Sequence, residues 1–503
     1  IIGFVLIFIL LLWVMNNNRP TQEELAKRKA EQEQAAKANN PQNNTATAAT
    51  ADLGAFAYSN AQPTAKDGVT VIENKDVKLT INNKGGDLKE VLLKQFKTYE
   101  SMPVYLIKDK NAIFALNFKT TQGQELNTQQ LYFEPSLSQK DGKQLLSMKV
   151  KTGENSYLEY VYTLPAEGYM VDVAVRSQGL SGVLNSQNPI ELVWGLKARR
   201  MEKSVTYENR YTQSAIRYAD DKINRMSQGG NSGTKEEQVS WVAYKQHLFT
   251  SVLISDSAFA NGDFLSYNIA NEESKDVKYT KNLKSTFPLK TKGGELSESL
   301  HFYFGPSDYN VLKQYNDKYE LTELIPLGWG IFGWLNKWLF IPLYNFLADY
   351  FSVGLVIILM TIIVRLLLSP IVYKSYVSQA KMKVLRPEIE EINKKYEEPM
   401  KRQQETMALY SKAGVNPMSG CIPAVAGVLS PLQLFPYRIW ASPKEFLMGR
   451  RPFLIRCDIR VAILNSFLRQ PRESVPAIGF SSYFYLLNDD NGTDRTTTTT
   501  WYA

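Results

Sequence analysis

The sequence predicts a multi-domain membrane protein, in which a large antiparallel β-sandwich stands between an N-terminal transmembrane anchor and an α-helical membrane part. Three observations predict this class. Residues 1–15 and 352–373 are apolar segments of the kind that enters a bilayer, and residues 69–310 alternate repeatedly between apolar and polar side chains. The mean hydropathy of -0.27 is what a polar domain and a few apolar segments produce together.

Composition excludes several classes of function. Hydrophobic residues make up 44% of the 503 residues and charged residues 21%, which is unlike a collagen or a disordered chain. Cys421, Cys457, His247 and His301 are isolated, so we expect no metal site, no cofactor and no catalytic triad, and hence not an enzyme. The net charge is +8, and its positive residues cluster beside a predicted membrane helix rather than with aromatic residues in a soluble domain. No DNA partner is therefore expected.

The first segment, residues 1–15, is predicted to be an uncleaved transmembrane anchor. Fifteen helical residues span roughly 22 Å, short of a ~30 Å hydrocarbon core. The run also lacks an initiator Met, so we expect a missing N-terminal piece to precede it. A cleaved signal peptide is the alternative, but Asn16 and Arg19 follow where a small-residue cleavage site would stand. Residues 16–68, rich in Asn, Gln, Ala and Thr, are predicted to be a flexible tether.

The next segment, residues 69–315, is predicted to be the β-sandwich domain. Val77, Leu79 and Ile81 alternate with polar neighbours, and the pattern recurs many times between turn signals. Nucleophile elbows, phosphate loops and paired carboxylates are absent from its sequence. Its many tyrosines, such as Tyr160, are expected to pack in the core rather than to form a sugar-binding platform.

Two membrane-associated helices are predicted after the sandwich. Residues 324–348 are rich in Trp, Phe and Leu with few charges, which favours an interfacial amphipathic helix over a buried soluble one. Residues 352–373 form the strongest apolar segment of the chain. As a helix it would span about 33 Å, so it is predicted to be transmembrane.

One charge, Arg365, interrupts this apolar segment. It lies nine residues before Lys374, which is roughly 13 Å along a helix. Placing an arginine at that depth costs at least ~2.5 kcal/mol, so the side chain is expected to face water or a partner; snorkelling to the interface is the alternative. Thr361 lies one helical turn earlier on the same face, which predicts a polar stripe along an intramembrane hydrophilic groove.

Residues 374–415 are predicted to form a cytoplasmic helical hairpin. Pro387 suits a helix start, and Glu397-Glu398-Pro399 suits the hairpin tip. The basic excess beside a transmembrane end places this side in the cytoplasm, and the sandwich on the opposite side. The basic candidate residues of the hairpin are Lys381, Lys383, Arg386, Lys394, Lys395, Lys401 and Arg402.

Specific motifs lie between residues 361 and 423. They are Val364-Arg365 with Ser369-Pro370, QAKMKVLRPEI at 379–389, MALY at 407–410 and NPMSGCIP at 416–423. Together with the anchor, tether and β domain, these motifs resemble the YidC/Oxa/Alb family of membrane protein insertases, in the diderm-bacterial form with a large periplasmic domain. The resemblance covers residues 1 to about 424.

The resemblance implies an α-helical insertase core whose groove opens to the cytoplasm and the bilayer. The family's groove arginine corresponds to Arg365 and its substrate-facing threonine to Thr361. The implied location is the bacterial inner membrane, multi-pass, with the large domain in the periplasm. The implied partners are nascent membrane proteins, the Sec translocase, membrane lipids and, through the hairpin, the ribosome. The alternative is a membrane-tethered periplasmic binding or envelope-scaffold protein, in which the sandwich is the active part.

The end of the sequence departs from the family pattern. Residues 416–437 are predicted to begin a further transmembrane helix that is degraded, with Pro431 and Pro436 interrupting it. Residues 1–437 hold 38 Lys and 11 Arg, whereas residues 438–503 hold one Lys and eight Arg. This reversal predicts that residues 438–503 are an out-of-frame tail, the change of frame lying near Ala424; a divergent tail is the alternative. The insertase core is then incomplete, and we expect the chain as written not to replace a full-length insertase.

Overall fold

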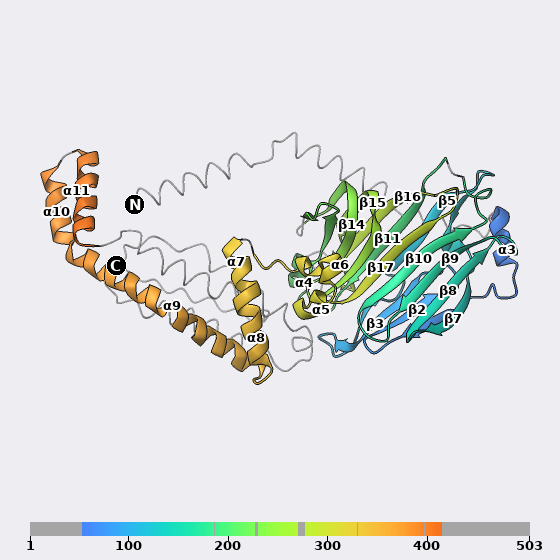
Figure 1. Cartoon of the computed structure of the whole chain (residues 1–503), viewed down its shortest axis with the longest axis horizontal. Coiled ribbons are helices and arrows are strands. Elements are labelled where there is room, and N and C mark those ends of the chain that lie inside the picture. Colours follow the sequence, from blue (N-terminus) through green and yellow to red (C-terminus); the bar gives the residue numbers. More distant parts are fainter. Residues whose placement is uncertain are drawn as a thin grey trace, which may run out of the picture. The chain divides into compact units, whose positions relative to one another are not determined.

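A computed structural model describes residues 53–414, except residues 186, 227–229, 270–276, 329 and 397 (Figure 1). The predicted anchor at 1–15, most of the tether, the segment at 416–437 and the tail at 438–503 lie outside the described residues.

Two antiparallel sheets form the β domain, as the sequence predicts. The smaller has the order β1-β2-β3-β4, and the 13-stranded sheet has the order β6-β5-β11-β16-β15-β17-β10-β9-β8-β7, with β14 also pairing with β15, β12 with β14 and β13 with β12. The strands of the smaller sheet are β1 (Val69–Glu73), β2 (Val77–Asn82), β3 (Leu88–Lys97) and β4 (Pro103–Ile107). The strands of the larger sheet are β5 (Ala112–Lys119), β6 (Glu125–Asn127), β7 (Glu134–Lys140), β8 (Lys143–Lys151), β9 (Tyr157–Leu164), β10 (Met170–Gln178), β11 (Ile190–Arg199), β12 (Gln213–Tyr218), β13 (Ile223–Arg225), β14 (Ser232–Lys245), β15 (Phe249–Asn268), β16 (Tyr279–Leu289) and β17 (Ser297–Pro306).

The period-two pattern of the sequence determines which side chains are buried. Val77, Leu79 and Ile81 on β2 are all fully buried, because alternate residues of a strand point to the same face. The two sheets share one hydrophobic core. The hydroxyl of Tyr162 on β9 donates a hydrogen bond of 2.8 Å to the carbonyl of Gly86, in the turn between β2 and β3, and so ties the larger sheet to the smaller one. Tyr160, which is fully buried, confirms the prediction that tyrosines pack in the core.

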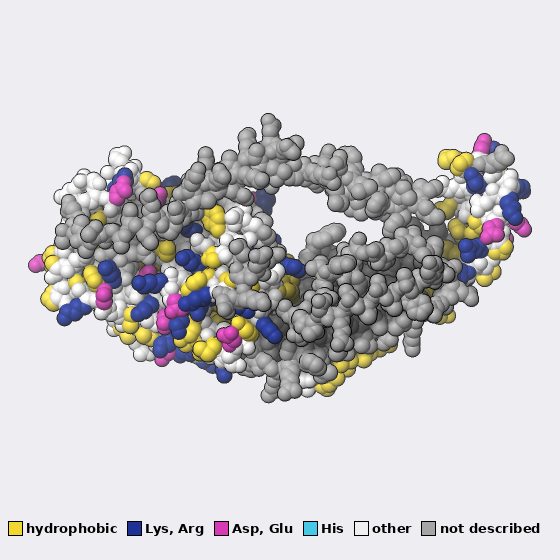
Figure 2. All heavy atoms as spheres, turned by 180° about the vertical axis from the view of Figure 1, so that it is seen from behind, with side chains coloured by type: hydrophobic (Ala, Val, Ile, Leu, Met, Phe, Trp, Pro, Cys, Tyr) yellow, Lys and Arg dark blue, Asp and Glu magenta, His cyan; other side chains and the backbone are white. Residues whose placement is uncertain are grey.

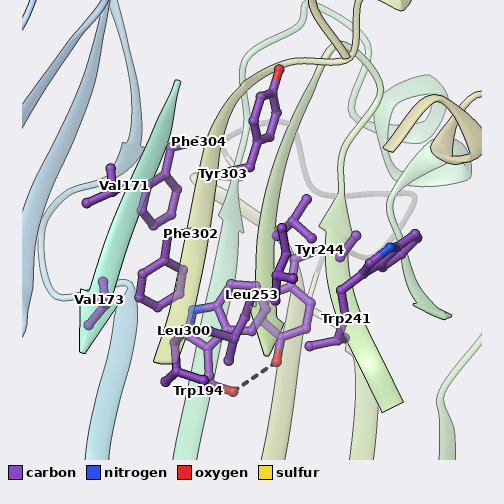
Figure 3. Close-up of a cluster of buried hydrophobic side chains, with 14 of the residues drawn as sticks. Val171, Val173, Trp194, Trp241, Tyr244, Leu253, Leu300, Phe302, Tyr303 and Phe304 are labelled. Carbon is purple, nitrogen blue, oxygen red and sulfur yellow. Dashed lines mark hydrogen bonds between the residues drawn. The ribbon is translucent and has the colours of Figure 1, made fainter. Parts of the chain in front are cut away.

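Two of the largest side chains of the core, Trp194 of β11 and Tyr244 of β14, meet in its interior (Figure 3). The rings of Trp194 and Tyr244 stack with centroids 3.9 Å apart. The Tyr244 hydroxyl donates to the carbonyl of Trp194 at 2.8 Å, so its polar end is satisfied inside the core. Phe302 of β17 lies against the other side of this cluster, with its ring centroid 5.7 Å from that of Trp194.

The β domain begins earlier than the sequence predicts. The predicted tether at 16–68 includes two short helices, η1 (Gly54–Phe56) and α3 (Ala57–Asn60), which belong to the domain. Phe56 is fully buried, and its ring lies 5.1 Å from that of Phe118. A single aromatic residue in a polar stretch gives no periodic signal, which is why the prediction places the boundary at 69 rather than before Gly54.

Short helices complete the domain: η2 (Thr128–Gln130), α4 (Val205–Tyr211), α5 (Tyr309–Lys313), α6 (Asn316–Tyr319) and η3 (Leu321–Leu324). The interfacial helix predicted at 324–348 starts later, because Leu324 and Ile325 are buried in the core of the β domain and Gly328 has a positive φ of 94°. The helical part then runs through α7 (Gly330–Leu335), a π-helical turn η4 (Asn336–Phe340) and α8 (Ile341–Ala348). Trp334 and Trp338 are largely exposed.

Helix α9 (Val353–Val384) is longer than the predicted segment 352–373, and extends into the sequence assigned to the hairpin. Within the described residues, no single helix is long and apolar enough to cross a membrane. The two parts of α9, Gly354–Pro370 and Val372–Val384, are bent by 46° relative to each other, and together they are long and apolar enough for one span. A proline at this position removes a main-chain hydrogen bond and bends a helix.

The hairpin consists of α10 (Arg386–Lys395) and α11 (Pro399–Lys412). Pro387 lies in the first turn of α10, as the sequence predicts. The break between the helices falls at Tyr396 and Glu398, next to the predicted tip, and Pro399 is the first residue of α11.

Candidate functional site

Three polar side chains follow one another at four-residue intervals on α9. Thr361 is half-buried, and Arg365 and Ser369 are exposed. Because four residues make about one helical turn, all three lie on the same face. We call these residues the polar stripe. Its neighbours along the helix are apolar, including the exposed side chains of Ile362 and Leu366.

The polar stripe faces away from the packed side of α9. Val356, Met360 and Val364 are buried, and helix α8 packs against α9. At about 100° per residue, Val364, Met360 and Val356 lie about 100°, 140° and 180° around the helix from Arg365. The described structure therefore leaves the polar stripe uncovered by α8.

The hydroxyl groups of the polar stripe are satisfied within the helix. The Thr361 hydroxyl donates to the carbonyl of Ile357 at 2.7 Å, and the Ser369 hydroxyl donates to that of Leu366 at 2.9 Å. Arg365 makes no ion pair with any residue in the described part of the chain. Its guanidinium donors are thus directed at whatever surrounds the helix, whereas the hydroxyls still offer acceptor lone pairs.

The geometry suits recognition of an anionic or polar group beside an apolar surface. An arginine presents several donors in a planar fork that matches a carboxylate. Flanking apolar residues lower the local dielectric, which strengthens that attraction. Ser369 was not among the predicted site residues, although it continues the four-residue spacing from Thr361 and Arg365, and that spacing is the signal that could have found it.

The hairpin helices pack through a narrow apolar seam. Leu385, just before α10, and Ile389 and Ile392 on α10 are half-buried at spacings of four and three residues, and Leu409 is half-buried on α11. This matches the heptad-like pattern of the sequence. Figure 2 shows basic, acidic and hydrophobic side chains mixed over the outside of the hairpin.

The seven predicted basic residues lie outside this seam, except Arg402, which is half-buried. Lys401 pairs with Glu398 at 3.2 Å, and the Lys395 ammonium lies 5.5 Å from the ring centre of Tyr396. The residues fall into three groups: Lys381 and Lys383 at the end of α9, Arg386, Lys394 and Lys395 on α10, and Lys401 and Arg402 on α11. The structure does not bring them to Arg365, since Lys381 is sixteen residues further along α9, on the order of 20 Å.

No metal-ligand cluster of His, Cys, Asp and Glu is present in the described ranges. The two histidines contact acidic side chains instead: His247 contacts Glu202, and His301 contacts Asp172 at 2.7 Å.

Two family models match consecutive parts of the chain. The one described as the YidC periplasmic domain matches residues 69–342, and the one described as the 60Kd inner membrane protein matches residues 343–437. The boundary between them falls within α8, beyond the last strand of the β domain. The first match alone covers more than half of the chain.

The chain belongs to the YidC family of membrane protein insertases. A membrane protein insertase YidC of Parabacteroides distasonis is 37% identical over 75% of this chain, and that match spans 61% of the relative's own length. A Bacteroides fragilis relative of the same name is 34% identical over 95% of this chain and 78% of its own length. A Porphyromonas gingivalis relative of the same name is 36% identical over 75% of this chain and 62% of its own length.

The Bacteroides fragilis match bears on the tail of this YidC family member. A share of 95% is more than the 437 residues that precede the tail, so the match includes part of residues 438–503. The out-of-frame origin of that tail stays a prediction.

Among solved structures, an active YidC insertase with its first transmembrane domain resolved is similar at a TM-score of 0.30 and 18% identity, over 77% of this chain and 75% of that one. An Escherichia coli protein described as a putative aldose 1-epimerase reaches the same TM-score at 8% identity, over 48% of this chain and 99% of that one. Likeness at these scores says nothing about the activity of this family member.

Proposed function

We propose that this chain takes part in the insertion of membrane proteins into the bacterial inner membrane, with the polar stripe of α9 as its substrate-contacting surface. Thr361 and Arg365 would contact the polar flank of a segment that is crossing the bilayer. A wet, cationic surface part-way across shortens the distance over which that flank must cross dry hydrocarbon. Such a mechanism needs no cofactor and no bond-making step.

The observation that carries the proposal is the environment of Arg365. Its guanidinium is exposed, has no acidic partner among the described residues, and lies at least about 100° around α9 from the packed residues Val356, Met360 and Val364. An arginine in an apolar helix with no internal partner is expected where an external polar partner binds. Membership of the insertase family supports a nascent membrane protein as that partner.

Site-specific photocrosslinking tests this surface. A photoreactive amino acid is placed at Thr361, and ribosome-bound nascent chains of a membrane protein with an acidic flank are supplied in membranes containing the variant. Leu367 provides the matched control, because it is exposed and lies about 120° around α9 from Thr361 and about 160° from Arg365. We expect crosslinks to the nascent chain from Thr361 and few from Leu367.

Equal crosslinking from Thr361 and Leu367 would show that lipid exposure, rather than the polar stripe, determines the contacts. An absence of crosslinks from both positions, in membranes where the protein is present, would contradict the proposed surface. In that case an Arg365→Ala variant without any effect would favour the alternative of an envelope-scaffold protein.

The same proposal includes the side of the membrane on which each part of the chain lies, and the partners of these parts. The hairpin of α10 and α11 is proposed to lie in the cytoplasm, because its basic excess follows an apolar segment. The β domain is then periplasmic, the arrangement multi-pass, and α7 to α8 interfacial. The Sec translocase, membrane lipids and, for the hairpin, the ribosome are the proposed partners beyond the nascent chain.

A further inference from the structure

A cleft of about 400 Å³ opens on the β domain, far in sequence from the polar stripe. It is formed by the turn between β3 and β4, the end of β11 and the start of β16. Four cationic side chains line it: Lys108, Arg199, Arg200 and Lys278. A volume of this size is typical of a site for a small molecule or a headgroup.

Three of the four cations of the cleft, Arg199, Arg200 and Lys278, are held by polar contacts. Arg199 and Lys278 share the carboxylate of Asp109, at 2.8 and 2.9 Å, and these two partners lower the pKa of Asp109 to about 2. The Arg200 guanidinium donates to the carbonyls of Glu202 and Lys203 at 3.0 and 2.6 Å. Side chains held in this way lose little further freedom when an anion binds.

Aromatic rings line the cleft beside these cations. The Lys108 ammonium lies 4.0 Å from the ring centre of Tyr105, and the Arg200 guanidinium lies 5.2 Å from that of Tyr99. Asp109 beside the cleft and Glu100 on its wall offset two of the four positive charges, so a net positive charge remains. An anion is therefore the expected ligand.

Apolar side chains project from the rim of the same cleft. On the turn between β3 and β4, Met102 is 60% exposed and Tyr99 is 39% exposed. Exposed apolar residues beside clustered cations are typical of a surface that meets anionic lipid, since the former enter the interface and the latter bind headgroups. A soluble acidic peptide would not require the exposed Met102.

This turn lies at the same end of the domain as the end of β17, the last strand before the helical part. Phe96 of β3 lies 5.2 Å from Phe249, and Phe249 pairs with Pro306 at the end of β17. From the buried Ile325, only nine residues lead to the exposed Trp334, at most about 30 Å of extended chain.

We propose that this cleft binds the phosphodiester headgroup of an anionic lipid, with Tyr99 and Met102 entering the adjoining interface. The proposal rests on the proposed membrane location of the helices after Gly330, but not on the substrate surface of α9. Its ligand would be a lipid such as phosphatidylglycerol, whose phosphate carries the negative charge that the four cations attract.

Lipid photolabelling of the full chain in nanodiscs tests it. The probes are phosphatidylglycerol and phosphatidylcholine with the same photoreactive group near the headgroup, and the labelled peptides are mapped by mass spectrometry. We expect phosphatidylglycerol to label residues 98–108 in clear preference to phosphatidylcholine, and both lipids to label α9. Labelling of α9 reports the membrane location independently, so failure of that location is distinguishable from failure of the cleft.

The deciding variant is Lys108→Gln with Lys278→Gln, because both side chains are at least partly exposed and their loss is compatible with folding. The preference for phosphatidylglycerol at 98–108 should fall about tenfold or more. Lys140→Gln with Lys143→Gln on the β7–β8 hairpin removes the same charge from outside the cleft, and should leave the preference unchanged.

Three results would overturn the proposal. The first is equal labelling of residues 98–108 by the two lipids, and the second is an unchanged preference in the Lys108→Gln, Lys278→Gln variant. The third concerns a Tyr99→Ser, Met102→Ser variant, which keeps every charge. It should weaken labelling by the lipid without changing binding of inorganic phosphate, and unchanged labelling would assign the cleft to free phosphate instead.

Discussion

The Tyr244 hydroxyl donates a hydrogen bond of 2.8 Å to the main-chain carbonyl of Trp194, and the two rings stack 3.9 Å apart in the core. The two residues are 50 positions apart and lie on β14 and β11, which do not pair with each other. The same hydroxyl lies 2.7 Å from that of Ser285 on β16. This contact therefore joins the branch of β12, β13 and β14 to the main path of the larger sheet.

Replacing Tyr244 by Phe should lower the free energy of unfolding of the β domain by about 1–3 kcal/mol, because the Trp194 carbonyl and the Ser285 hydroxyl lose a buried partner. The measurement is urea unfolding of the full chain in detergent, followed by the circular dichroism of the β-sheet. Tyr58→Phe is the matched control, since Tyr58 is 39% exposed and makes no such bond. Equal effects of the two substitutions would contradict the assigned role.

Replacing Phe56 by Ala should destabilise the β domain by about 3–5 kcal/mol, as expected for a fully buried aromatic side chain. Limited proteolysis should then cleave near residues 54–60 at lower protease concentrations. Tyr58→Ala in the same helix pair is the control, and should have little effect. A Phe56→Ala domain of unchanged stability would show that residues 54–60 are part of the tether after all.

Glu208 makes the stability of the domain depend on pH. Burial, and then the nearby carboxylate of Glu202, raise the pKa of Glu208 from 4.5 to about 8. The folded state thus holds more protons than the unfolded state between these values, and the free energy of unfolding falls as the pH rises through this window, by up to about 1.4 kcal/mol per pH unit. Glu208→Gln should flatten this slope, since an amide does not ionise.

The slope is best measured between about pH 5 and pH 7. Above that range Lys245 contributes the opposite slope. Burial lowers the pKa of Lys245 to about 7, so this lysine is protonated in the unfolded chain but neutral in the folded chain. Glu154→Gln is the matched control, as Glu154 is exposed. If the slope persists unchanged in Glu208→Gln, another buried group is responsible for it.

Arg365→Ala should reduce the insertion of a reporter with an acidic translocated flank by about tenfold, which corresponds to about 1.4 kcal/mol of lost attraction. Arg365→Lys keeps the charge and should retain most of the insertion. The measurement is protease protection of the flank in proteoliposomes, with Leu366→Ala as the control. A reporter with a neutral flank should respond much less to Arg365→Ala, and an equal loss for both reporters would argue against electrostatic attraction.

Some features of the structure follow from local sequence alone. The alternation of Val77, Leu79 and Ile81 predicts a strand and its buried face, because both depend only on the backbone period. Pro387 and Pro399 predict where helices begin, because proline fits the first turn of a helix without the loss of a main-chain hydrogen bond that it causes in the interior. The four-residue spacing of Thr361 and Arg365 likewise determines that they share one face of a helix.

Other features required the folded chain. Nothing in the sequence around Phe56 indicates that it packs on Phe118, and the length of α9 beyond residue 373 depends on a helix that continues past Pro370. The cleft of Lys108, Arg199 and Lys278 combines three segments that are separated by up to 170 positions.

Local periodicity, composition and motifs are enough to indicate the family, the order of an antiparallel β domain before an apolar helical part, and the single arginine in that part. Three features emerge only from the folded chain: where the β domain begins, how the 13 strands of its larger sheet are ordered, and which cations meet at one end of it. Strand order and clefts arise from contacts between residues far apart in sequence, and a one-dimensional pattern carries no record of which distant segments pack together.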